Sequence, residues 1–403
     1  METFIRKLLR LKAHQVTAVE PSPEPMVIGI DRMGRRRLRC RGCGWPGAKI
    51  HQVEAARQWQ HLSLWGLPVV LHYHPRRVRC PNCGVRREAV PWAGAWARVT
   101  TVLARAVAEW ARHLSWQETA RHFRLDWKSV ASMVRRLGAY GLERRRRRPL
   151  HTLGIDEVSR RKGHHYLTIV YDLEGGVLLW VGEDRTEQTL SRFFTELGCR
   201  RSRTLQVVCL DMGQAYLKAV HLHAANAQLL FDRFHLLQQL NRAVDEVRRS
   251  EMRRLSGQEK TSFKRTRFLL RKNPWNLRTD EGERLSTLVR RNTPILRAYY
   301  LKEACQLFWS YRQPARAEEH LRRWRHSALR SRLQPFKEFV RRLRAHLDGV
   351  LAWTRLRVSN GALEGMNNKI KLVSHRSFGF RTVKNFTAAI YHCCAHLPLP
   401  EEC

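Results

Sequence analysis

The sequence lacks any run of about 18 apolar residues, the length that a helix needs to cross a bilayer. Residues 1–12 also lack the continuous apolar core of a secretory signal peptide. We therefore expect no membrane among the partners and a location in the cytoplasm. Thiols stay reduced in that compartment, so the ten cysteines are expected to be metal ligands or buried side chains rather than disulfides.

Acidic residues are scarce relative to basic ones. The 403 residues include 35 Asp and Glu against 75 Lys and Arg, which leaves a formal net charge of +40. An excess of this size indicates a polyanionic partner. Most of the cations are arginines, whose planar guanidinium suits phosphate oxygens better than an ammonium group does. Nucleic acid is therefore the expected partner.

The pattern of apolar residues divides the chain into several parts. Residues 27–93 hold short β-like runs and two cysteine pairs, which is typical of a small loop-rich module that needs a metal to stabilise it. Residues 97–142 change to helical periodicity, and the arginine run in 143–150 indicates a basic linker. Residues 151–403 predict a mixed α/β domain, interrupted by a strand-free helical insertion over about 236–355.

The first part of this α/β domain predicts three strands, a helix and a fourth strand. A further helix, a short strand and a long helix from residue 233 follow them. This order resembles the ribonuclease H-like fold, in which the first and fourth strands lie side by side. The predicted strands are 151–156, 164–172, 176–182 and 205–211, with the helix at 186–197.

Two C-x-x-C pairs, each followed by glycine, mark the N-terminal module: Cys40 with Cys43, and Cys80 with Cys83. Four thiolates at this spacing predict one tetrahedral Zn²⁺ that folds the module without taking part in chemistry. The glycines allow tight turns in which backbone amides point at sulfur. Four buried or redox-active cysteines are the alternative, and a histidine between the pairs could replace one cysteine as a ligand.

The helical segment predicts three short helices with breaks at 114–115 and 125–126, the pattern of a helix-turn-helix. Asp126 is placed to cap the third helix, which we predict to be the recognition helix. A plain three-helix packing module is the alternative. The residues expected to face the DNA groove are Trp127, Lys128, Ser129, Ser132, Arg135 and Arg136.

Two aspartates are placed at the ends of strands that we predict to be buried. Asp156 ends the first predicted strand, and Asp211 ends the fourth after four apolar residues. A carboxylate there is costly unless it meets a cation. Because the two strands are neighbours in the expected order, Asp156 and Asp211 should face each other, and divalent cations would relieve their repulsion.

A third acidic ligand is expected from a late helix at 359–371. Glu364 would share one helix face with Asn367, Asn368 and Lys371, which we expect to contact DNA. A solvated amphipathic surface is the alternative for this face.

Asp156, Asp211 and Glu364 together could hold two Mg²⁺ or Mn²⁺ ions, one activating water or a 3′ hydroxyl and the other stabilising the leaving oxygen. Asp232 and His235 are expected to support these ligands or to contact the substrate.

Several sequence blocks connect these motifs. They are C-x-x-C-G twice, GIDE at 154–157, HHYLTIVYD at 164–172, LDMGQAY at 210–216, DRFHLLQQLN at 232–241, SNGALEGMNNKIK at 359–371 and FGFR at 378–381. Over nearly its whole length the chain thus resembles insertion-sequence transposases of the ISL3 family. The resemblance implies a zinc-binding domain, a helix-turn-helix and an RNase H-like DDE domain with a helical insertion. It also carries the catalytic acids over to Asp156, Asp211 and Glu364.

The resemblance implies a bacterial, nucleoid-associated transposase that binds double-stranded DNA at the element's terminal inverted repeats. Metal-dependent cleavage and strand transfer into target DNA would follow, performed by a homo-oligomer, a dimer or larger, on the DNA. The alternative is a catalytically silent, sequence-specific regulator derived from a transposase. A nuclease or resolvase that cuts branched DNA is a third possibility, which would not need so large a DNA-reading region.

Overall fold

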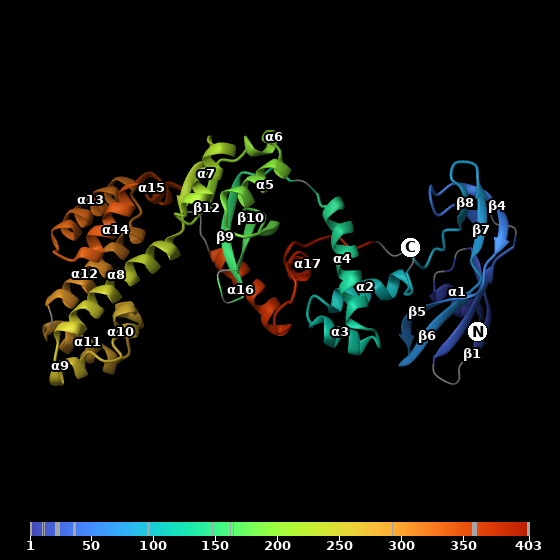
Figure 1. The fold of residues 1–403 in the computed structure, drawn as a ribbon, viewed down its shortest axis with the longest axis horizontal. Helices are drawn as coiled ribbons and strands as arrows, with labels where there is room; N and C mark the ends of the chain where they lie inside the picture. The colour runs from blue at the N-terminus through green and yellow to red at the C-terminus, as the bar shows by residue number, and fades with distance from the viewer. Residues whose placement is uncertain are drawn as a thin grey trace. The chain divides into compact units, whose positions relative to one another are not determined.

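The structure is a computed structural model that describes residues 2–9, 11, 13–20, 25–34, 38–94, 97–146, 148–161, 163, 165–291, 293–356 and 361–400. The chain divides into two compact units (Figure 1), of which the first contains Met1–Arg146 and Val373–Cys403 and the second contains Arg147–Leu372. Among the described residues, no helix combines the length and the apolar character that crossing a membrane requires.

The first unit begins with two four-stranded sheets. One has the order β1-β2-β6-β5, and the other has the order β3-β4-β7-β8. The first sheet buries Ile28, Trp59 and Leu71 in a core to which Ile5 of helix α1 also contributes. This core therefore begins well before residue 27, where we expected the module to start. The elements are α1 (Glu2–Leu8), β1 (His14–Glu20), β2 (Met26–Arg32), β3 (Leu38–Arg39), β4 (Pro46–Val53), β5 (Arg57–Leu64), β6 (Leu67–Tyr73), β7 (Arg76–Cys80) and β8 (Gly84–Arg87).

Three helices follow, α2 (Thr101–Trp110), α3 (Trp116–His122) and α4 (Trp127–Arg144), as the sequence predicted. The predicted cap is confirmed, because the Asp126 side chain accepts a hydrogen bond from the backbone N–H of Ser129. Helix α3 begins with a capping box in which Ser115 and Glu118 satisfy each other's backbone amides. Such caps fix where each short helix begins.

The last helix, α17 (Val383–Cys394), packs against α4 in the first unit. We expected residues 373–403 in the α/β domain, but they belong to the first unit, and the buried Val373 and Ala389 join the core of α2, α3 and α4. Ala389 contributes to that core, Arg135 donates a 2.7 Å hydrogen bond to Asn385, and Nε2 of buried His392 contacts the Ala108 carbonyl oxygen at 2.6 Å. The amphipathic pattern of α17 by itself does not specify which surface its apolar face covers.

The second unit contains a five-stranded sheet in the order β11-β10-β9-β12-β13. β9 pairs antiparallel with β10, and β10 with β11, whereas β9, β12 and β13 pair in parallel. This confirms the predicted mixed α/β domain and its neighbouring first and fourth strands. The elements are β9 (Thr152–Arg161), β10 (His165–Asp172), β11 (Val177–Glu183), α5 (Glu187–Leu197), α6 (Cys199–Ser202), β12 (Val207–Leu210), α7 (Gln214–His223) and β13 (Gln228–Phe231).

The described residues from 233 to 356 contain helices and no strand, as predicted for the insertion. Their apolar side chains share one continuous core with the sheet, and Gly349 allows α15 to approach Phe231 of β13 closely. The helices are α8 (Arg233–Arg254), α9 (Gly257–Ser262), α10 (Arg267–Arg271), α11 (Thr279–Arg291), α12 (Thr293–Gln306), α13 (Pro314–Arg330), α14 (Gln334–Arg344) and α15 (Leu347–Leu356), with 3₁₀ turns at Pro274–Asn276 and Leu307–Ser310.

Helix α16 (Gly361–Arg376) begins in the second unit, and its last turn belongs to the first. It confirms most of the helix predicted over 359–371, of which residues 359 and 360 lie outside the described residues.

The packing of the C-terminal segment predicts that replacing two of its phenylalanines will change the stability of the first unit by very different amounts. Phe386 is 1% exposed and stacks on Phe380, with ring centroids 5.2 Å apart, whereas Phe378 is wholly exposed. We expect Phe386→Ala to destabilise the first unit by about 3–5 kcal/mol because it leaves a cavity. Phe378→Ala should change stability by less than about 0.5 kcal/mol. Hydrogen exchange of α4 peptides, with peptides of α13 as the internal reference, measures both effects, and equal exchange in the two variants would contradict this packing.

Candidate functional site

Asp156 and Asp211 lie on neighbouring strands of the sheet in the second unit. β9 and β12 are parallel, with Gly154 opposite Cys209, so two residues further along Asp156 is level with Asp211. Asp211 directly follows β12, as predicted, but Asp156 does not end its strand. β9 continues to Arg161 because it still pairs with β10, in which His165 is opposite Arg161. The two carboxylates therefore meet where the shorter strand ends.

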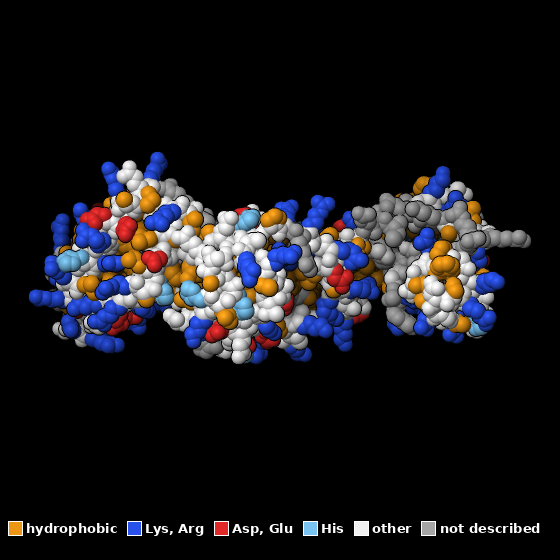
Figure 2. Space-filling model, turned by 90° about the horizontal axis from the view of Figure 1, so that it is seen from above, with side chains coloured by type: hydrophobic (Ala, Val, Ile, Leu, Met, Phe, Trp, Pro, Cys, Tyr) orange, Lys and Arg blue, Asp and Glu red, His pale blue; other side chains and the backbone are white. Residues whose placement is uncertain are grey.

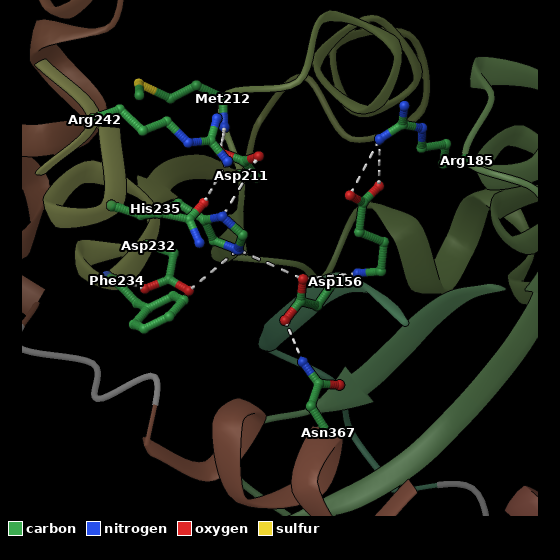
Figure 3. A network of polar contacts seen from close by, with 11 residues as sticks. Asp156, Arg185, Asp211, Met212, Asp232, Phe234, His235, Arg242 and Asn367 are labelled. Carbon is green, nitrogen blue, oxygen red and sulfur yellow. Dashed lines mark hydrogen bonds and ion pairs between the residues drawn. The ribbon is translucent and has the colours of Figure 1, made fainter. Parts of the chain in front are cut away.

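Three carboxylates surround His235, which lies in the first turn of α8 (Figure 3). Its Nε2 atom is 3.6 Å from an oxygen of Asp156 and 3.8 Å from one of Asp232, and its Nδ1 atom is 3.7 Å from Asp211. Burial alone would lower the pKa of His235, but the bond with Asp156 and the charges of Asp211 and Asp232 outweigh it and raise the pKa to about 9. The imidazole is therefore a cation at neutral pH.

Backbone amides hold one oxygen of each carboxylate. The N–H of Glu157 donates to Asp156 at 2.7 Å, and the N–H of Met212 donates to Asp211 at 2.6 Å. Asp232 accepts from the N–H of Phe234 at 2.7 Å, which also caps α8. These bonds fix the orientation of the three carboxylates before anything binds.

Helix α16 adds an amide to this group. Nδ2 of Asn367 donates a hydrogen bond to the second oxygen of Asp156, as Figure 3 shows. The other end of the same amide, Oδ1, is buried and has no hydrogen-bond partner. An unsatisfied buried acceptor beside carboxylates is costly unless a donor or a cation completes it.

A cavity of about 540 Å³ opens over this group of residues. Asp156 and the exposed Glu364 both line it, so the structure brings the first and third predicted acids to one cavity. Asp211 is not among the lining residues and joins the group through its contact with His235. Other lining residues are Glu157, Asp232, Phe234, His235, Trp353, Asn367, Asn368 and Lys371.

Glu364, Asn367, Asn368 and Lys371, the predicted polar face of α16, all line this cavity. Asn367 is half-buried against Asp156, whereas Asn368 and Lys371 are exposed. The central position of His235 was missed, since the sequence suggested only a supporting role for it. Its position three residues after the helix-capping Asp232 was the available signal.

The four paired cysteines form a compact cluster in the first unit. All four Sγ atoms lie within 4.8 Å of one another, and Cys43 and Cys80 are 3.5 Å apart. The N–H of Gly42 points at Sγ of Cys40 from 3.3 Å. The glycines that follow the pairs, Gly44 and Gly84, have positive φ values of +72° and +68°, as the tight turns require. Within the described residues, this is the only group of three or more possible ligands that close together.

Among the residues that the structure describes, no histidine belongs to this cluster. His61 pairs instead with the hydroxyl of Thr100, its Nδ1 atom 2.8 Å from Oγ1, and His72 stacks edge-on with His74. The four predicted cysteines thus lie together, and the structure places these two histidine contacts outside their cluster.

The predicted DNA-facing residues of α4 fall into two groups. Trp127, which is 47% exposed, and Lys128, Ser132 and Arg136 point into solvent. The remaining two, Ser129 and Arg135, are partly buried and make contacts within the protein. Ser129 binds the capping Asp126, and Arg135 binds Asn385.

Comparison with known proteins agrees with this layout. A family model described as transposase, of the ISL3 group, matches residues 153–390, and a model of the helix-turn-helix domain of transposase family ISL3 matches residues 88–138. The chain is similar to the transposase for insertion sequence element IS1001 of Bordetella parapertussis, with 31% identity over 87% of each chain. It is also similar to the transposase for insertion sequence element IS1557 of Mycobacterium tuberculosis, with 29% identity over 89% of this chain and 86% of the relative.

The cysteine cluster predicts that the purified chain carries one tightly bound metal ion. We expect Cys80→Ser to lose that ion and to expose β3, β4, β7 and β8 to hydrogen exchange, because a sheet this small has little core of its own. Cys199→Ser, which changes an exposed cysteine outside the cluster, should keep it. Elemental analysis of the two variants and the wild type checks this, and an unchanged metal content in Cys80→Ser would refute the site.

Proposed function

The chain belongs to the ISL3 family of insertion-sequence transposases, and we propose that it cuts and joins DNA with divalent metal ions held by Asp156, Asp211 and Glu364. One observation carries this proposal. Asp156 and Asp211 are level on adjacent strands, and Glu364 lines the same cavity as Asp156. We further propose that this domain has the RNase H-like fold, on the basis of its strand order and of three antiparallel strands joined to two parallel ones.

The donor atoms fit a hard divalent cation. Carboxylate oxygens are the ligands that Mg²⁺ and Mn²⁺ prefer. The buried, unpaired Oδ1 of Asn367 and the cationic imidazole among three carboxylates both indicate a site built to surround positive charge. The chemistry that two such ions supply when bound is activation of the attacking water or 3′ hydroxyl and stabilisation of the leaving oxygen.

The chain's own residues orient these ligands. The N–H groups of Glu157 and Met212 and the amide of Asn367 hold Asp156 and Asp211 in fixed orientations. His235 offsets the charge of the carboxylates and keeps them together. We assign Asn367 to positioning Asp156, and the exposed Asn368 and Lys371 to contact with DNA beside the cavity.

We propose that the first unit reads the terminal inverted repeats through α4. The exposed Trp127, Lys128, Ser132 and Arg136 supply the contacts, while Arg135 stabilises the helix through Asn385. The net charge of +40 supports a polyanionic partner, and Figure 2 shows Lys and Arg side chains outnumbering Asp and Glu on the face in view. We assign Zn²⁺ to the four cysteines, and a homo-oligomer on DNA because two element ends must be joined.

The proposal predicts which carboxylates are indispensable. With linear DNA that carries the element's own end and Mg²⁺ or Mn²⁺, we expect Asp156→Asn, Asp211→Asn and Glu364→Gln each to lower the cleavage rate by at least about a thousandfold, because each removes a metal ligand. Glu318→Gln, on the exposed surface of α13, is the matched control and should cut like the wild type. If the wild type bound this DNA specifically but did not cut it, the result would instead favour a catalytically silent, sequence-specific regulator.

A second prediction concerns competition between His235 and the metal. In chelator, His235→Gln should melt at a lower temperature than the wild type because three carboxylates lose their cationic partner. Added Mn²⁺ should raise the melting temperature more in this variant than in the wild type, since no imidazole has to be displaced. His326→Gln, an exposed change on α13, should respond like the wild type. An equal response in all three proteins would show that His235 and metal do not compete.

A further inference from the structure

The FGFR block exposes one aromatic side chain completely. Phe378 lies between α16 and α17 with an exposed fraction of 101% and a φ of +52°. A bulky residue in this left-handed region is strained and persists only where the surroundings impose it. Here the N–H of Phe378 donates to the His375 carbonyl at 3.0 Å, and that of Gly379 donates to the Ser374 carbonyl at 2.8 Å. The backbone thus holds the ring out in solvent.

Residues on both sides fix this loop to the helix-turn-helix. Before it, the guanidinium of Arg376 donates to the carbonyl oxygens of Arg112 at 2.6 Å and of Ala111 at 3.3 Å. After it, the ring of Phe380 packs edge-on against Trp116, with centroids 5.5 Å apart, and stacks on the buried Phe386. The loop is therefore anchored at both ends, and little conformational entropy remains to be lost when Phe378 binds something.

The recognition helix is bonded directly to the segment that follows the loop. The N-cap of α17 is Thr382, and Asn385 in its first turn accepts the 2.7 Å hydrogen bond from Arg135 of α4. The loop and the predicted recognition helix, α4, are thus parts of one packed module within the first unit.

The charge around Phe378 indicates the chemistry of its partner. The sequence has no Asp or Glu between residues 365 and 400, and Arg381 and Lys384 beside the loop are exposed. Trp65 provides a contrast, because it is 82% exposed with a φ of +50° but has no Lys or Arg from residue 58 to residue 75. A rigid aromatic ring flanked by cations suits a nucleotide, whose base stacks on the ring and whose phosphates meet the cations.

We propose that Phe378 stacks on a base of the bound DNA that is unstacked where the protein distorts the duplex, while Arg381 and Lys384 contact the adjacent phosphates. Phenylalanine side chains that enter a base step in this way partly unstack it and kink the DNA. This inference rests on the proposed DNA-binding function. It adds to the module a base-contacting site that lies outside its three helices, formed by residues from the far end of the chain.

The test uses the full-length protein and duplexes that carry the element's inverted repeat, with the fluorescent base 2-aminopurine placed at successive positions. The wild type should change the fluorescence sharply at one or two adjacent positions, as an unstacked base does when it meets a ring. Phe378→Ala should abolish that change and weaken binding roughly tenfold. Phe378→Trp, which keeps an aromatic face, should retain both, and Trp65→Ala should behave like the wild type.

The outcomes separate this inference from the function on which it rests. A Phe378→Ala variant with wild-type affinity and a wild-type fluorescence profile overturns the stacking role. A variant that keeps the profile but changes the number of protein copies per complex overturns it too, and assigns the ring to a protein contact. Failure of the wild type to bind the repeat would instead refute the proposed DNA-binding function, and the stacking role with it.

Discussion

The site depends on holding several carboxylates close together inside a folded domain. Like charges repel one another, more strongly inside a protein than in water, so the positions of these carboxylates must be imposed by the fold. Strand pairing fixes Asp156 beside Asp211, and the first turn of α8 brings Asp232 and the cationic His235 to them. The imidazolium offsets part of the repulsion, which explains why a histidine lies among the acids.

The same requirement explains why distant segments meet here. The sheet alone supplies two of the proposed ligands, and both the counter-charge and the proposed third acid come from helices. Asn367 of α16 secures this arrangement by binding the Asp156 oxygen that the backbone leaves open. Since Asn367 and Glu364 lie on one face of one helix, the bond that positions the amide also positions the acid.

Local patterns allowed much of this to be predicted from the sequence. An apolar run before Asp211, the i, i+3, i+4 spacing after Glu364 and the paired cysteines each reflect short-range chemistry that a single segment reveals. The helix-turn-helix was likewise readable from its caps. The capping box of Ser115 and Glu118 has the S-x-x-E spacing, which is a second local signal for the start of α3.

What the sequence could not provide were contacts between segments far apart. Nothing local indicates that β9 continues past Asp156, because its extension depends on pairing with β10. The position of His235 depends on the direction in which α8 leaves β13, and the apolar face of α17 would fit any complementary surface.

The C-terminal segment shows the consequence for function. Because Ala389 and Val373 complete the core of α2, α3 and α4, the module predicted to read DNA is not the continuous stretch 97–142 but a composite of the middle and the end of the chain. A helix-turn-helix isolated at residue 142 would lose Phe380 and Asn385, the partners of Trp116 and Arg135. Helix α16 carries Glu364 in its first turn and contributes Val373 and Arg376 to this composite in its last. The predicted catalytic acid and the closing core of the predicted reading module are therefore encoded on one helix, so a change in the length of that helix would alter both.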